Sequence, residues 1–147
     1  FGFGVRGGIE AAVHSAHLFL TKFSSDDAFI KLDFKNAFNS NRRDKILAAV
    51  FYICPSIYPL VFSSYLSPSS LFWDNEIINS AEGVQQGDPF GPLLFCFTLN
   101  SFMQCLNSDF CVGYFDDISL CGSMSSLLSD LSEKLKMWVI LKSGKLL

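Results

Sequence analysis

The stretch that decides the fold is Phe110–Cys121, which reads FCVGYFDDISLC. Apolar and β-forming residues lead up to two adjacent carboxylates, Asp116 and Asp117, and continue after them. This pattern predicts two antiparallel strands joined by a tight turn. Close carboxylates raise each other's pKa unless a cation neutralises them, and Mg²⁺ prefers oxygen ligands. An ordinary Asp-Asp turn accounts for the motif about equally well, because aspartate favours turns.

A third carboxylate, Asp33, lies near the end of a second strand pattern, 28–34, which reads AFIKLDF. Apolar residues alternate there with Lys31 and Asp33, as in a half-buried strand. A carboxylate in an apolar strand is costly unless it is paired or bound to a metal. Taken alone, a strand-end aspartate that faces solvent is the better interpretation of Asp33.

A glycine- and proline-rich loop precedes an apolar helix pattern at 93–107. Its residues 85–92 read QQGDPFGP. Glycine lets a backbone approach a ligand closely, and the start of a helix offers free N–H groups to a phosphate or base. An ordinary loop that leads into a helix is the alternative.

The remaining periodicity predicts an α+β fold in which helices pack on one face of an antiparallel sheet. We expect a single domain over 1–147, with Asn41 as the N-cap of its second helix. Beyond the segments already quoted, the pattern predicts helices at 9–23, 42–53, 55–66 and 123–137, a hairpin over 71–78, and a final strand at 138–141.

Composition limits the function classes. The 147 residues are 50% apolar and carry a formal net charge of −3, which argues against disorder and shows no basic nucleic-acid surface in the totals. Two stretches, 46–73 and 89–108, have no charged residue. Prolines and polar residues interrupt both, so buried helices are a better interpretation than membrane spans.

The cysteines and histidines point to no metal or disulfide framework. Five cysteines without C-x-x-C spacing, each in an apolar setting, predict buried free thiols and an intracellular protein. Glu10, His14 and His17 share one helix face, where they could ligate a metal. With only two histidines in the chain, ordinary surface residues are the favoured interpretation.

Three motifs in order resemble one family. Residues 30–39 (IKLDFKNAFN), 86–92 (QGDPFGP) and 114–117 (YFDD) are similar to three palm motifs of the reverse transcriptases, especially those of non-LTR retrotransposons. A lone Asp-Asp is common, whereas the three motifs in this order and spacing are specific. The resemblance extends from about Gly2 to about Lys145.

The resemblance implies a metal site. Asp33 and Asp116 would bind two Mg²⁺ ions, which Mn²⁺ could replace, with Asp117 assisting and the carbonyl oxygen of Phe34 as a further ligand. The implied reaction is transfer of nucleotides from dNTPs to a DNA primer on an RNA template, in a two-metal arrangement.

The resemblance also implies a nucleotide site. Phe38 matches the bulky residue that excludes a ribose 2′-hydroxyl, and the backbone around Ala37 would donate N–H groups to the triphosphate. Gln86 and Gly87 would line the pocket near the template base. Lys145 loosely resembles a lysine that protonates pyrophosphate.

The resemblance further implies a palm fragment, with the fingers segment before Phe1 and the thumb after Leu147. Two alternatives stay open. One is an inactive palm that acts at most as a binding module. The other is an RNA-directed RNA polymerase, against which Phe38 argues because enzymes that use ribonucleotides generally avoid a bulky residue there.

Overall fold

The computed structural model describes residues 6–34 and 36–135. The described residues divide into two compact units, one formed by residues 6–34 with 102–135 and the other by residues 36–101. Helices and antiparallel strands occur together, which confirms the predicted α+β class.

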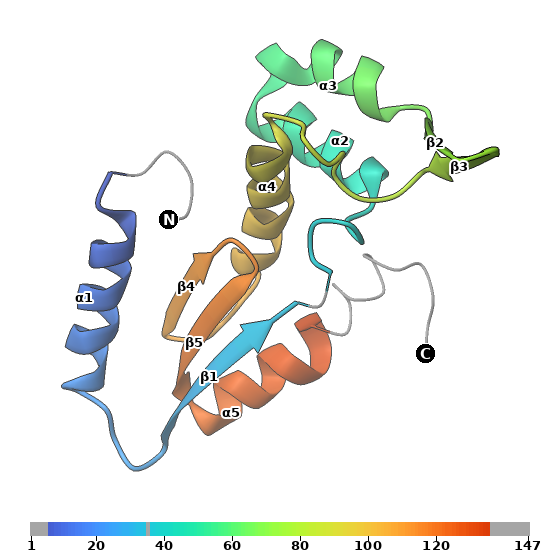
Figure 1. Cartoon of the computed structure of the whole chain (residues 1–147). Helices are drawn as coiled ribbons and strands as arrows, with labels where there is room; N and C mark the ends of the chain where they lie inside the picture. The colour runs from blue at the N-terminus through green and yellow to red at the C-terminus, as the bar shows by residue number, and fades with distance from the viewer. Residues whose placement is uncertain (1–5, 35, 136–147) are drawn as a thin grey trace. The chain divides into compact units, whose positions relative to one another are not determined.

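The first unit is built on a three-stranded antiparallel sheet in the order β1-β5-β4 (Figure 1). Its strands are β1 (Asp27–Asp33), β4 (Phe110–Tyr114) and β5 (Asp117–Ser123). The strand predicted at 28–34 and the strand pair predicted around the Asp-Asp turn are both confirmed. Because β5 pairs with β1 on one side and β4 on the other, it is the central strand.

The face of the sheet opposite Asp117 is buried. Side chains alternate along β5, so the fully buried Ile118 and Leu120 lie on the face opposite Asp117. Helix α5 (Met124–Ser129) contacts β5 and β1, and its Leu127 is also fully buried. Helix α1 (Gly8–Leu20) contacts β4 instead.

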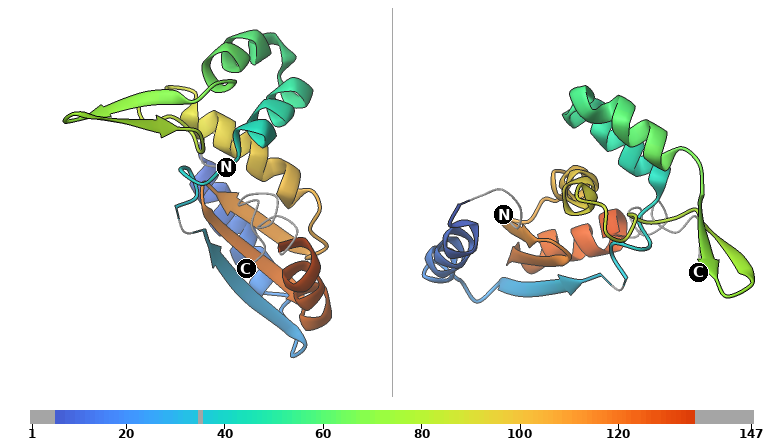
Figure 2. Two further views of the ribbon diagram at one scale, coloured as in Figure 1. Left: turned by 90° about the vertical axis from the view of Figure 1, so that its right-hand side faces the viewer. Right: turned by 45° about the horizontal axis from the view of Figure 1, so that its top comes forward.

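The second unit contains helices and a separate hairpin (Figure 2). Its core includes the fully or almost fully buried Ile46, Val50, Leu94 and Phe95. Its elements are α2 (Arg43–Ile53), the short 3₁₀ helix η1 (Pro55–Ile57), α3 (Tyr58–Tyr65), the hairpin strands β2 (Ser69–Trp73) and β3 (Glu76–Ser80), and most of α4 (Gly91–Met103).

Several predicted helix boundaries are wrong. Arg42 rather than Asn41 is the N-cap of α2, and the Asn41 side-chain nitrogen is buried without a hydrogen-bond partner. Helix α4 ends at Met103 rather than at residue 107. The last predicted helix is an α-helix only to Ser129 and continues as a π-helix, η2 (Asp130–Leu135).

Other predictions concern burial and extent. All five cysteines are free thiols, but only Cys121 is buried and Cys105 is exposed, so the prediction of uniform burial is wrong. Glu10, His14 and His17 are exposed on α1. In the part of the chain that the structure describes, no helix is long and apolar enough to cross a membrane. The strand predicted at 138–141 lies outside the described residues.

Candidate functional site

Two of the three predicted catalytic carboxylates lie side by side on neighbouring strands of the sheet. Asp33 is the last residue of β1 and Asp117 the first of β5, and the register pairs them directly. Directly opposed residues on antiparallel strands have Cβ atoms about 5 Å apart, and like charges there destabilise the sheet. Asp33 is exposed and the side chain of Asp117 is half exposed. The sheet therefore holds two carboxylates together at the end of β1 and the start of β5, where both are accessible to solvent. This arrangement lowers the stability of the sheet.

A lysine partly neutralises this pair. The Nζ atom of Lys31 lies 3.0 Å from Oδ1 of Asp117. Lys31 precedes Asp33 by two residues in β1, so the two side chains share one face of the sheet. Both members of the ion pair are exposed, and such pairs contribute little to stability. The ammonium group of Lys31 nevertheless offsets part of the negative charge of the two aspartates. A divalent cation bound at the same place would offset it too.

The third carboxylate lies in the turn between β4 and β5. Tyr114 pairs with Asp117 in the ladder, so only Phe115 and Asp116 form the turn. Phe115 has a φ of 52°. A bulky residue in the left-handed region is an outlier that costs on the order of 1–3 kcal/mol. Ordinary turns have Gly, Asn or Asp at such positions. Backbone strain in other residue types is found most often at functional sites.

The carboxylate oxygens at this end of the sheet are ligands of the kind that a hard cation such as Mg²⁺ prefers. Within residues 6–34 and 36–135, however, no group of three or more His, Cys, Asp or Glu side chains is arranged to hold a metal ion. Phe34 follows β1, and its ring meets that of Phe102 edge-on at 6.3 Å. The fold thus supplies two opposed carboxylates and a third carboxylate in the adjoining turn.

Of the predicted nucleotide-binding residues, Phe34 lies in the first unit, whereas Ala37, Phe38, Gln86 and Gly87 lie in the second. Ala37 is 3% exposed, and the ring of Phe38 stacks on that of Phe95 with centroids 4.4 Å apart. The carbonyl oxygen of Phe38 accepts a hydrogen bond of 2.9 Å from the N–H group of Val84. This bond joins the Ala37–Phe38 segment to the start of the loop that carries Gln86.

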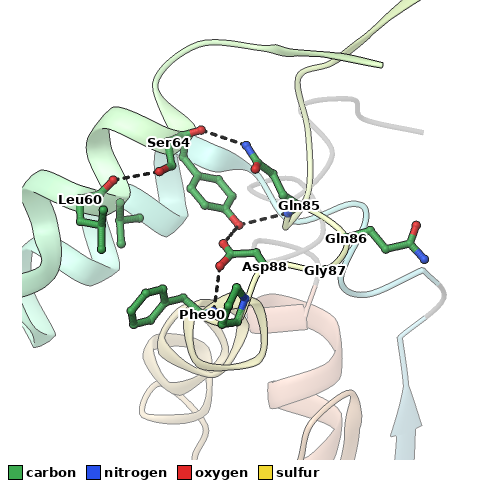
Figure 3. A pocket seen from close by; sticks show the side chains of 10 residues that line it. Leu60, Ser64, Gln85, Gln86, Gly87, Asp88 and Phe90 are labelled. Carbon is green, nitrogen blue, oxygen red and sulfur yellow. Dashed lines mark hydrogen bonds between the residues drawn. The ribbon is translucent and has the colours of Figure 1, made fainter. Parts of the chain in front are cut away.

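Gln86 and Gly87 are exposed at the turn of that loop. Figure 3 shows the Gln86 side chain directed away from the carboxylate of Asp88. Gly87 has a φ of 85°, and a Cβ there would meet nothing within 4 Å. Glycine is therefore required by the backbone conformation rather than by lack of space. Lys145 lies outside the described residues.

Sequence reasoning missed the residues that hold this loop. Tyr65 and Arg43 are both buried, and both contact the loop or its flanks. Their partners are 20 to 40 residues away in the sequence. Periodicity reports burial along one element and not which distant polar group a side chain meets, so no local signal could have found them.

A comparison with protein families identifies the family of this chain. The family model described as reverse transcriptase (RNA-dependent DNA polymerase) matches residues 5–144. A comparison with curated proteins gives no significant match. The fold and the site define a palm-type α+β domain that presents carboxylates at the ends of two paired strands. Because the family model covers nearly the whole chain, the chain belongs to the reverse transcriptase family.

Proposed function

We propose that this chain is the palm of an RNA-directed DNA polymerase of a retroelement, of the non-LTR type that its motifs resemble. The observation that carries the proposal is the register of β1 and β5, which sets Asp33 opposite Asp117 beside the turn that carries Asp116. Family membership supports the reaction class, which is template-directed addition of nucleotides to a primer.

In this proposal Asp33 and Asp116 hold divalent metal ions, with the carbonyl oxygen of Phe34 as a further ligand. When bound, two Mg²⁺ ions would neutralise charge and promote attack of the primer 3′-hydroxyl on the incoming nucleotide. Asp117 assists while bonded to Lys31. Most of the protein's contribution to such chemistry is positioning and charge neutralisation, with little covalent work.

Selection of the sugar would fall to Phe38. Its ring is fixed by stacking on Phe95, and its carbonyl by the N–H group of Val84. A ring held in this way beneath the 2′ position would clash with a ribose hydroxyl and favour dNTPs. Gln86 and Gly87, exposed on the adjoining loop, would meet the base pair that forms, and Lys145 would protonate the leaving pyrophosphate.

Primer extension on an RNA template tests the proposal. We expect Asp33→Asn and Asp116→Asn to abolish extension, because each removes a charge that the metal ions require. Asp74→Asn is the matched control: Asp74 lies in the β2–β3 turn with a φ of 52°, which asparagine also tolerates. Unchanged activity of Asp116→Asn would contradict the assignment.

Two further measurements separate the alternatives. A preference for ribonucleotides over dNTPs would favour an RNA-directed RNA polymerase. Titration with Mn²⁺, followed by electron paramagnetic resonance, reports metal binding without turnover, and Asp33→Ala should weaken it. Metal binding without primer extension would favour an inactive palm that serves only in binding.

A further inference from the structure

The loop that carries Gln86 and Gly87 is fixed by a tyrosine from another element. Tyr65 is the last residue of α3 and is 2% exposed. Its hydroxyl donates a 2.5 Å hydrogen bond to Oδ2 of Asp88 and accepts a 3.1 Å bond from the N–H group of Gln85 (Figure 3). One phenol oxygen therefore bonds both residues that flank the Gln86–Gly87 turn.

The same two flanking residues have further anchors. Nε2 of Gln85 donates to the carbonyl oxygen of Ser64 at 2.9 Å and to Oγ of Ser69 at 2.8 Å. Oδ1 of Asp88 accepts from the N–H group of Phe90 at 2.8 Å, at the entry to α4. The turn is thus held at both of its ends, while the Gln86 side chain is exposed and is directed away from Asp88 (Figure 3).

A hollow beside this loop shows why the anchors matter. Its volume is about 420 Å³, and its walls include Leu60, Val61 and Ser64 of α3. Tyr65 and loop residues 85–90 form the rest of its lining. Because there is open space beside the loop, packing alone does not fix its path. The bond from Tyr65 to Asp88 joins α3 to the loop across this region.

Arg43 completes the arrangement behind Tyr65. Its guanidinium carbon lies 5.4 Å from the centroid of the Tyr65 ring, and the residue is 7% exposed. It donates to the carbonyl oxygens of Gly83 and Ser67 and to Oγ of Ser80, at 3.2 to 3.3 Å. These acceptors are all neutral. A buried cation held in this way is costly unless its surroundings compensate it, and the aromatic face supplies part of that compensation.

We propose that Tyr65, supported by Arg43, is a positioning residue that sets the conformation of the Gln86–Gly87 turn and thereby the fit of the incoming dNTP. This inference rests on the proposed polymerase function. Tyr65 touches neither nucleotide nor metal in this proposal and acts only through the loop. Burial, together with the bond to Asp88, raises the pKa of Tyr65 to about 12. The phenol therefore stays protonated and donates to Asp88 at any physiological pH.

Tyr65→Phe tests the inference, because it removes one oxygen atom and leaves the ring beneath Arg43. The N–H group of Asp88 donates a 3.1 Å hydrogen bond to the carbonyl oxygen of Gln85, which closes the turn. We expect this amide hydrogen to exchange about tenfold faster in the variant, the change that follows from losing a hydrogen bond to a charged group. The KM for dNTPs should rise by about the same factor while kcat changes less than about twofold. Tyr52→Phe is the matched control, since Tyr52 is 82% exposed.

The two measurements separate failure of the inference from failure of the proposed function. Exchange is read without catalysis, so faster exchange confined to residues 85–88 supports the positioning role even in a protein that extends no primer. Wild-type exchange of the Asp88 amide in Tyr65→Phe would overturn it. Faster exchange throughout the second unit, α2 included, would also overturn it, because Tyr65 would then be a general stabilising residue. In an active protein, a fall in kcat without a change in KM would contradict the assigned role.

Discussion

Asp130 is a buried carboxylate on which the entry to β4 depends. It is 1% exposed at the start of η2, and its oxygens accept hydrogen bonds from the N–H groups of Asn107 and Ser108 at 2.9 Å. Oγ of Ser108 donates at 2.6 Å, and Nζ of Lys134 lies 3.2 Å away. Asn107 and Ser108 lead into the strand that ends at the candidate catalytic turn. Asp130→Asn is therefore the substitution in the first unit whose effect the structure defines most completely.

The cost of Asp130→Asn follows from these contacts. Hydrogen bonds to a charged group contribute about 1 kcal/mol more than neutral ones, and the variant neutralises the acceptor of three such bonds. It also leaves Lys134, whose side chain is 21% exposed, without its ion-pair partner. We expect the free energy of unfolding to fall by about 3 kcal/mol, the lower end of the range for breaking a buried charge pair.

The effect should depend on pH in a definite direction. Burial alone would raise the pKa of the Asp130 carboxyl, but the hydrogen bonds from Ser108, Asn107 and Lys134 outweigh it and hold the pKa below its ordinary value. A depressed pKa contributes stability above the pKa of the unfolded chain, about 3.9, and this stability is lost as the pH falls toward the folded value. The difference between wild type and Asp130→Asn should therefore be full at pH 7 and shrink below about pH 4.

Urea unfolding of the full chain, followed by circular dichroism at several pH values, measures this difference. Glu133→Gln is the matched control, because it removes an exposed carboxylate from the same helical turn and should change stability by less than about 0.5 kcal/mol. A loss for Asp130→Asn no larger than that of Glu133→Gln at pH 7 would refute the reasoning. A difference that grew below pH 4 would refute the sign of the pKa argument.

Three further predictions concern other elements. Gly83→Ala should lower the free energy of unfolding by about 3 kcal/mol in urea titration, because Gly83 has a φ of 73° and a Cβ would lie 2.6 Å from Cα of Asn39. Lys31→Met should tighten Mn²⁺ binding about three- to fivefold in a paramagnetic resonance titration, since it removes a competing cation from Asp117; weaker binding would contradict this. Ser123→Ala should cost about 1 kcal/mol in thermal unfolding, because Oγ of Ser123 caps α5; a loss under about 0.3 kcal/mol would show that this cap is unimportant.

The strands of the first unit were predictable from the sequence because local pattern and tertiary setting agree. Residues 30–34 alternate between apolar and polar, and in the observed β1 Ile30 and Leu32 are partly buried while Lys31 and Asp33 are exposed. The Asp-Asp turn was predicted for the same reason, since β-formers continue on both sides of it. That Asp33 lies opposite Asp117 could not be derived from periodicity, because strand pairing across 83 intervening positions has no local signal. The resemblance to a family assigned Asp33, Asp116 and Asp117 to one site, but it did not predict this register.

Helix ends were less predictable, because distant polar groups decide them. The apolar pattern of α4 continues to residue 107, yet the helix ends at Met103. The N–H groups of Asn107 and Ser108 bond instead to Asp130, more than twenty residues later. A charged acceptor that is buried and already paired outcompetes the last turn of a helix. The prediction of Asn41 as an N-cap was wrong for a related reason, because Asn41 is buried and its carbonyl oxygen accepts from the N–H group of Gly83.

The turn between β4 and β5 shows how stability is lost at the proposed active site. Among the described residues, three non-glycine residues have positive φ, and two of them are Asn36 and Asp74, types that tolerate this conformation. Phe115 does not tolerate it well, and it precedes a pair of adjacent carboxylates. A strained aromatic residue, opposed aspartates and an exposed ion pair each cost stability or add little to it. Because the ladders of β5 with both neighbours hold this turn in place, its geometry is set before any cation or nucleotide arrives, which is the preorganisation that charge-neutralising catalysis requires.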